Sequence, residues 1–454
     1  MLTPKLSLPL TLVLVAGCSG EGPVTSVPDD LSDDSRCPAI FAQNLVPEYH
    51  VTISDPELAK LDGEFKNRPI TDPPGFDHNP YHPIELRYQD IVVPDAMIRL
   101  KGQSSWFETV ALDANPKMQF VISFNEINDK GRFYGVRKLE LDMPRSDHSF
   151  LQQRLALWQF RKSGINAQCA NSARLFLNGK YYGLYTNLER MDKEFLQRSF
   201  GADDEGDLWE GGRIIQTNEE TFHWTRLDMF WHLGNLAQLS LIVDFDVSVR
   251  MWSVDAMMGN ADGYYNGRAN FFLYDHPTRG FMWLPHDLDT AFNATYLPPD
   301  TSPLFTDAPG RNKHDREHWA LVMDDAAWLD RYVAMLTEAR ASFDVKALQA
   351  RVDGWSAQIA ASVVEDPHFV AGFEDHRAAT AAVRSFVARR AEAVDSWLAC
   401  RNGGGPDLDR DGYSSCYDCV DNDATAFPGA AELCNGRDDD CDGRTDDAEA
   451  LTCQ

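Results

Sequence analysis

Residues 259–292 constrain the fold more than any other stretch, because two short apolar runs lie there between acidic residues. The runs FFLYD and FMWLP are separated by the turn-forming residues His276 to Gly280, a pattern that predicts a β-hairpin. Such a hairpin brings Asn270 and Asp287 close together, with Asp262 on the loop that enters it. Carboxylate and amide oxygens at one hairpin mouth suit a hard cation such as Mg²⁺. The alternative is a plain hairpin, because Asp and Asn are also common turn residues.

The chain is strongly acidic, with 42 basic and 70 acidic side chains among 454 residues. Nucleic acid is therefore not expected as a partner, because phosphate backbones require a basic protein face. The length allows two or three domains.

The N-terminus has the features of an export signal. Lys5 is followed by the apolar run Leu6 to Val15, which is too short to span a bilayer. Small residues directly before Cys18 predict a bacterial lipoprotein signal over residues 1–18, with lipidated Cys18 as the membrane anchor. An ordinary secretory signal is the alternative. Residues 19–36 are rich in Pro, Ser, Gly and Asp and are expected to form a flexible tether.

The cysteines agree with export. Nine are present, and eight remain when Cys18 is set aside. An even count in an oxidising compartment favours disulfides. Six of the eight lie from Cys400 onward, and sequence alone does not give their connectivity. Cys37 and Cys169 form a plausible pair by exclusion.

The body of the chain divides into a strand-rich half and a helix-rich half. Alternating or β-branched runs predict strands in a mostly antiparallel sheet, and a helix is predicted from Ser149 to Gly164. Asn178-Gly179 marks the turn of a second hairpin. Helical periodicity predicts further helices at 191–200, 227–241, 243–258, 319–343, 345–364 and 377–398. A cleft between the two halves is the expected place for a site.

Seven motifs between Ala96 and Phe292 resemble the CotH kinase family, atypical kinases first known from spore coats. They are MIRLKGQSS, the strand of Lys117, FYGVRKLELD, SFLQQRLALWQFRKSGI, ARLFLNGKYYGLYTNLERMDKEFL, GNADGYYNGRANFFLYD and PHDLDTAF. The resemblance implies an α+β fold like that of protein kinases, with a sheet-rich N-lobe over about 46–189 and a helical C-lobe over about 190–400.

The resemblance also implies ATP and Mg²⁺ or Mn²⁺ as cofactors, with roles for the acidic residues. Asp262 occupies the position of the catalytic-loop aspartate, which contacts the acceptor hydroxyl. Asn270 resembles the amide metal ligand of that loop, and Asn266 is a weaker choice. Asp287 resembles the metal aspartate of the second motif, with Asp289 adding to it or orienting it.

The nucleotide-binding residues are less clearly defined. Lys117 is expected to contact the α- and β-phosphates, and Lys101 is a rival for that role. Gly102 to Ser105, including Ser104, could place backbone N–H groups over phosphate. Glu189 is expected near the nucleotide, either contacting adenine or ribose or beginning a helix.

Two departures from the family pattern keep other functions open. His286 stands where an aromatic residue is expected, and a histidine beside two aspartates is also typical of a transition-metal site. The helix after Ser149 carries no glutamate to pair with Lys117. The leading expectation is a kinase for Ser or Thr of an exported or surface protein. The alternatives are a catalytically silent surface binding or structural lipoprotein and a metal-dependent phosphoester hydrolase.

Residues 401–454 form a short tail of different composition, rich in Asp, Gly and Cys. Two stretches have the spacing of Ca²⁺ loops, with glycine at the sixth place. The expected ligands are Asp407, Asp409, Asp411 and Asp418 in the first loop, and Asp438, Asp440, Asp442 and Glu449 in the second. The tail also resembles the MopE-type metal-binding repeat of exported bacterial proteins. Disulfides and Ca²⁺ are expected to staple it, whereas oxidation makes Zn²⁺ at Cys416 and Cys419 a weak alternative.

Overall fold

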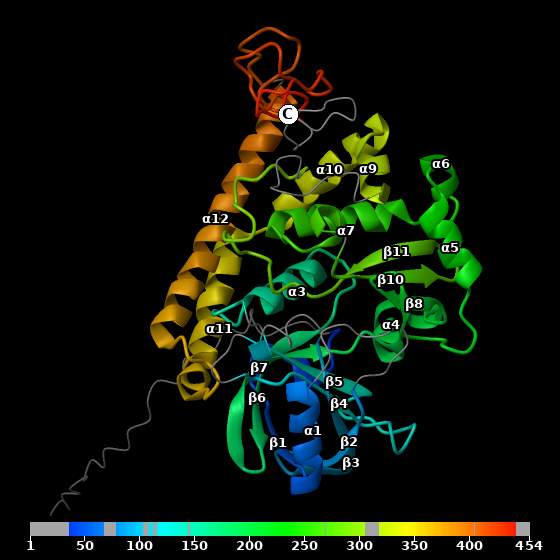
Figure 1. Ribbon diagram of the computed structural model, residues 1–454, viewed down its shortest axis with the longest axis vertical. Coiled ribbons are helices and arrows are strands. Elements are labelled where there is room, and N and C mark those ends of the chain that lie inside the picture. The colour runs from blue at the N-terminus through cyan, green and yellow to red at the C-terminus, as the bar shows by residue number, and fades with distance from the viewer. Residues whose placement is uncertain are drawn as a thin grey trace, which may run out of the picture.

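The computed structural model in Figure 1 describes residues 36–67, 79–102, 109–111, 116–143, 146–267, 269–304, 317–403 and 405–441. A strand-rich body lies at one end and a helix-rich body follows it, with the tail at the far end of the last helix. This arrangement confirms the predicted α+β class, with a sheet-rich N-terminal region and a helical C-terminal region.

Seven strands close into a barrel in the order β1-β2-β3-β4-β5-β7-β6. Their bounds are β1 (Glu48–Thr52), β2 (His82–Tyr88), β3 (Ile91–Leu100), β4 (Phe120–Ser123), β5 (Lys138–Asp142), β6 (Ala170–Leu177) and β7 (Lys180–Glu189). The sheet was predicted as mostly antiparallel, but β1 also pairs with β6 in parallel and closes it. Alternating residues such as Leu86, Ile98 and Leu139 fill the barrel interior, so the remaining residues of β3 and β5 face outward.

Three helices belong to the barrel or border it. Helix α1 (Asp55–Asn67), which sequence reasoning missed, packs on β2 and β3. Helix α3 (Gln152–Lys162), which was predicted, packs against β6, α7 and α11. Ten of its residues are buried, polar ones included, because the helix lies between the two bodies. A short 3₁₀ helix, η2 (Ala39–Phe41), precedes β1.

The helical body is built around a second sheet of order β11-β10-β8-β9. Its strands are β8 (Asp207–Glu210), β9 (Ile214–Ile215), β10 (Phe271–His276) and β11 (Gly280–Pro285). Every residue of β10 and β11 is buried, because α7 packs against β11 and β8 completes the sheet beside β10. The site hairpin therefore has a rigid support.

The helices of this body are α4 (Lys193–Phe200), η3 (Gly201–Asp203), α5 (Trp224–His232), α6 (Leu236–Leu239), α7 (Phe245–Met258), α8 (Tyr264–Gly267), α9 (Glu317–Met323), α10 (Ala326–Ser342), α11 (Val345–Glu365) and α12 (Phe373–Gly403). Two predicted helices are each divided in the structure. The first is interrupted around Gly234. The second is interrupted before α10, where the N-cap Asp325 accepts from the N–H of Trp328.

Disulfides fix both ends of the described chain. Cys37 and Cys169 are bonded, as predicted by exclusion. Cys400 bonds to Cys416 and so joins the end of α12 to the tail. These bonds indicate an oxidising, extracytoplasmic compartment. None of the helices in the described part of the chain has the length and hydrophobicity that crossing a bilayer requires.

Candidate active site

The hairpin of β10 and β11 forms as predicted, and its open end carries the polar residues of both motifs. Phe271 pairs with Pro285 at that end, so Asn270 and Asp287 lie just beyond the same end of the ladder. Both have positive φ, 50° for Asn270 and 47° for Asp287. Such backbone conformations cost a non-glycine residue energy and cluster at functional sites.

Asp262 lies on the loop that follows α7, and a hydrogen bond ties it to the hairpin. The Nδ2 group of Asn270 donates to Oδ2 of Asp262 over 2.8 Å. An amide that donates its NH₂ group in this way keeps its oxygen for a cation. The structure thus joins two of the predicted site residues. The side chain of Asn266, the weaker choice, lies outside the described residues.

Five carboxylates act on one another around the second motif. Burial raises the pKa of Asp287, and the neighbouring Asp142 carboxylate raises it further. Burial also raises the pKa of Asp289 well above its ordinary value, and the charge of Asp287 adds to the rise. Asp147 and Asp262 contribute to the same repulsion. Sequence reasoning missed Asp142 and Asp147, which come from β5 and from the approach to α3. Mutually repelling carboxylates of this kind are stabilised by a divalent cation.

Lys101, at the end of β3, faces this group of carboxylates. Its Nζ lies 2.8 Å from Oδ1 of Asp142 and 3.2 Å from Oε2 of Glu140. Burial alone would lower the pKa of Lys101, but Asp142 and Glu140 outweigh burial and raise it, with a further contribution from Asp287. Asp142 and Glu140, both on β5, are thus the acidic partners of Lys101.

A separate group of carboxylates lies in the tail. Ligand atoms of Asp407, Asp409 and Asp411 lie within 4.8 Å of one another. Asp418 belongs with them, since burial and the charges of Asp411 and Asp409 raise its pKa. Asp421, whose charge also acts on Asp418, is a member that the loop spacing did not predict.

One oxygen of each of four tail carboxylates is buried without a hydrogen-bond partner among the described residues. These atoms are the Oδ2 oxygens of Asp409, Asp411, Asp418 and Asp421. The other oxygen of each residue accepts from a backbone N–H, for example Oδ1 of Asp411 from Tyr413. Leaving buried carboxylate oxygens unpaired is costly, so this arrangement fits a bound cation.

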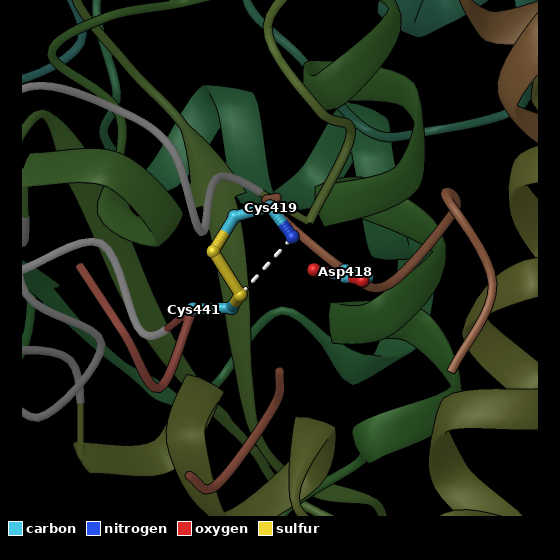
Figure 2. Close-up of side chains that lie close together, drawn as sticks. All are labelled: Asp418, Cys419 and Cys441. Atoms are coloured by element: carbon cyan, nitrogen blue, oxygen red, sulfur yellow. Dashed lines mark hydrogen bonds between the residues drawn. A yellow bond between two sulfur atoms is a disulfide. The ribbon is translucent and has the colours of Figure 1, made fainter. Parts of the chain in front are cut away.

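Figure 2 shows two cysteines of the tail, Cys419 and Cys441, joined in a disulfide. Cys419 is bonded to Cys441 beside Asp418, and the backbone N–H of Cys419 donates to the Cys441 sulfur. Cys416 is bonded to Cys400, so the weak Zn²⁺ alternative is wrong. A further group brings Glu432 together with the predicted Asp438 and Asp440. The other predicted ligands, Asp442 and Glu449, lie outside the described residues.

Comparison with known protein families assigns the body of the chain. The CotH kinase protein family matches residues 98–394, which is more than half of the chain. The chain belongs to the CotH kinase family. A second family, the Cu-binding MopE metal-binding motif, matches residues 418–447 in the tail. Both family resemblances stated above are confirmed.

Two further comparisons were made, one with solved structures and one with curated proteins. The solved structure of CtkA, a proinflammatory kinase of Helicobacter pylori, is similar with a TM-score of 0.33 and 9% sequence identity. That similarity covers 63% of this chain and 95% of the CtkA chain. A search of curated proteins gave no match.

In this CotH-family chain, Lys117 lies in a different environment from Lys101. Its Nζ is 2.6 Å from Oδ2 of Asp366 and also donates to the backbone oxygen of Leu184. The two charged side chains are only 4% and 0% exposed. The charge that acts on Lys117 is that of Asp366, whereas the site carboxylates Asp142 and Asp287 act on Lys101, so Lys101 fits the role of phosphate ligand better than Lys117. Its partner, undetermined from sequence, is Asp366 at the end of α11.

Glu189 is also engaged in structural contacts. Its carboxylate accepts from Arg198 at 2.7 Å and from the backbone N–H of Cys169 at 3.0 Å. The side chain is 2% exposed, so the predicted contact with adenine or ribose is wrong for this carboxylate. Gly102 has a φ of 90°, which fits a tight loop after β3. Ser104 lies outside the described residues.

His286 has contacts with the barrel side of the site. Its Nδ1 lies 3.3 Å from Oε1 of Gln168, and its ring packs edge-on against Phe272. One ring nitrogen is therefore occupied by a protein partner. The hydrolase alternative requires His286 to bind a metal together with its neighbour Asp287. The contact with Gln168 leaves only the other ring nitrogen of His286 for that role.

A cavity of about 470 Å³ opens between the barrel and the segments that follow β7 and β9. Arg99, Lys138 and Arg190 line it from the barrel side, and Gln216 and Asn218 line it from the helical body. Arg190 donates to Glu140, the same carboxylate that pairs with Lys101. The cavity is thus connected to the acidic site through one buried residue.

Proposed function

We propose that this CotH-family protein is an extracytoplasmic kinase that transfers the γ-phosphoryl group of ATP to Ser or Thr of an exported or surface protein. One observation carries the proposal: the Asp262–Asn270 pair and Asp287 lie at one hairpin end, and Lys101, at the end of β3, interacts electrostatically with Asp287. Phosphoryl transfer needs positioned phosphates, charge neutralisation and an acceptor base, and these residues supply the types required.

The residues at the hairpin end fit Mg²⁺ or Mn²⁺. Asp287 and the amide oxygen of Asn270 are hard oxygen ligands, and burial followed by the Asp142 carboxylate raises the pKa of Asp287. Asp289 lies close enough to share or orient the ion. When bound, the ion would neutralise charge on the phosphates.

The other residues of the site have separate roles in the proposal. Lys101 holds the nucleotide phosphates, and its pairing with Glu140 keeps its ammonium group in place. Asp262 accepts a hydrogen bond from the acceptor hydroxyl and receives its proton. The cavity lined by Arg190 holds the remainder of the nucleotide, because Arg190 donates to Glu140, which pairs with Lys101, and the cavity has room for a small molecule.

The fate of the γ-phosphoryl group tests the proposal against its two rivals. The full chain is incubated with γ-labelled ATP, Mg²⁺ or Mn²⁺ and an acidic Ser-rich acceptor protein. Label on Ser or Thr supports a kinase. Release of all label as free phosphate supports the hydrolase, and metal-dependent ATP binding without turnover supports a silent binding protein. Either of these last results overturns the kinase proposal.

We also propose that the tail binds Ca²⁺ and that Cys18 anchors the protein to a bacterial membrane. Residues 401–454 contain no histidine or methionine, and the described cysteines of the tail are in disulfides. Only oxygen ligands remain, which favours Ca²⁺ over copper despite the name of the matching motif. Labelling with a radioactive fatty acid, compared between wild type and Cys18→Ala, tests the anchor.

Calcium binding is expected to depend on the buried carboxylates of the tail. Asp418→Asn removes one ligand charge and should weaken Ca²⁺ binding at least tenfold, since affinity follows ligand charge. Competition with a chromophoric chelator measures this on the full chain. Asp423→Asn is the matched control, because Asp423 is occupied by Arg437 and Thr425. Equal Ca²⁺ affinities for wild type, Asp418→Asn and Asp423→Asn would contradict a Ca²⁺ site that includes Asp418.

A further inference from the structure

A buried polar connection joins the two loops that carry the acidic motifs. Oδ1 of Asn260 accepts from the hydroxyl of Thr290 over 2.9 Å. Asn260 lies two residues before Asp262, and Thr290 directly follows Asp289. The Asn260 side chain is fully buried and Thr290 is half-buried, so the acceptor end of this bond is shielded from water.

The side chain of Asn260 also contacts helix α7, through Asp255. Nδ2 of Asn260 lies 3.4 Å from Oδ2 of Asp255, which is 1% exposed. Burial raises the pKa of Asp255 well above its ordinary value, and the contact with Asn260 lowers it. Gly263 closes the loop over this pair, and a Cβ atom there would lie 2.6 Å from Oδ2 of Asp255. A tight turn over Asp255 and Asn260 is thus built into the loop.

Backbone contacts hold the outer parts of the same two loops. The hydroxyl of Tyr265 donates to the backbone oxygen of Asn260 at 2.8 Å. The N–H of Phe292 donates to the backbone oxygen of Met258, also at 2.8 Å. Of these contacts, the Asn260–Thr290 bond lies nearest in sequence to Asp262 and Asp289. The carboxylates of these two residues repel each other.

We infer that Asn260 and Thr290 are positioning residues that set the spacing between Asp262 and the Asp287–Asp289 pair. The inference rests on the proposed function for its catalytic consequence. The carboxylates repel one another, and Asp287 has a strained backbone with positive φ. The loop that carries Asp287 and Asp289 therefore needs a fixed attachment if both carboxylates are to face one cation. Thr290 supplies that attachment through its hydroxyl, next to the carboxylates themselves.

Thr290 is the residue to change, because it is only half-buried and tolerates an isosteric replacement. Thr290→Val removes the hydroxyl and keeps the shape, whereas Thr290→Ser keeps the hydroxyl. We expect Thr290→Val to raise the Mg²⁺ concentration for half-maximal phosphoryl transfer about tenfold, the value of one buried hydrogen bond. Thr290→Ser should stay within about twofold of wild type, and Thr290→Val should remain folded with a slightly lower melting temperature, because the buried Asn260 loses a hydrogen-bond donor.

Binding of Mn²⁺, followed by electron paramagnetic resonance on the full chain, gives a second readout that needs no turnover. The bound Mn²⁺ that disappears in Asp287→Asn is the ion at the hairpin site, called the cleft site below. Mn²⁺ that remains bound in this variant belongs to the tail. Weaker cleft binding in Thr290→Val but not in Thr290→Ser supports the inference even if no phosphate is transferred. Wild-type metal affinity in Thr290→Val, or equal losses in both variants, overturns it. Absence of any Asp287-dependent Mn²⁺ binding overturns the inference and the proposed metal site together.

Discussion

Replacing Asp287 with asparagine is expected to reduce phosphoryl transfer by about a thousandfold or more. Asparagine preserves the shape of the side chain and removes its charge, so the metal loses its principal ligand. Charge stabilisation by a catalytic metal is worth several kcal/mol, and each ~1.4 kcal/mol corresponds to a factor of ten. Transfer of labelled phosphate at saturating ATP and Mg²⁺ measures the loss as a change in kcat.

A matched control separates this effect from a general loss of acidic charge. Asp228 lies on α5 with a side chain that is 72% exposed, and Asp228→Asn should transfer phosphate at the wild-type rate. An Asp287→Asn protein that keeps its activity within a few-fold of wild type would contradict the assignment of Asp287 as a metal ligand.

The second large effect is expected at the buried Lys117–Asp366 pair. Asp366→Asn leaves the Lys117 ammonium group buried without its counter-charge, and such a change destabilises proteins by about 3–5 kcal/mol. Asp366 also accepts from the backbone N–H of Leu184, so the pair attaches the end of α11 to the barrel. Urea unfolding followed by circular dichroism measures the change in the free energy of unfolding.

The double variant Lys117→Met/Asp366→Leu checks the physical reason. Removing both charges should restore much of the lost stability, since no charge is left buried and unpaired. Glu374→Gln is the control for an exposed ion pair, that with Arg377, and should leave stability unchanged. If Asp366→Asn unfolds at the same urea concentration as wild type, the pair does not stabilise the attachment.

Local patterns in the sequence predicted the elements that carry the site. The hairpin follows from two apolar runs around a turn, and α3 follows from its helical spacing, because both signals lie within short stretches. The closure of the barrel was not predictable in this way. It depends on β1 pairing with β6, strands separated by more than a hundred residues, and no local pattern encodes that contact.

The choice between Lys101 and Lys117 shows the same limit inside the site. Both lysines border a predicted strand, so their sequence contexts are alike. Their environments differ because Asp366, 249 residues from Lys117, reaches one of them, and Glu140 reaches the other. Glu189 was misassigned for a similar reason, since its partner Arg198 becomes a neighbour only when α4 folds back.

The metal ligands of the tail were predicted in part, from the spacing of acidic residues in the two Ca²⁺-loop patterns. Asp407, Asp409 and Asp411 follow the Ca²⁺-loop pattern and are gathered in the structure. Asp421 and Glu432 join the groups from outside the pattern, because disulfide-linked turns bring them in. A search for every acidic residue near a cysteine of the tail would have included both.

ATP binding with and without Mg²⁺, measured by calorimetry on the full chain, tests the cleft site most directly. Wild type is expected to bind ATP only with the cation, Lys101→Met is expected to bind at least tenfold more weakly, and a folded Lys117→Met is expected to bind like wild type. Binding that is unchanged in Lys101→Met, or no Mg²⁺-dependent binding in wild type, would contradict a nucleotide site formed by Lys101 and Asp287.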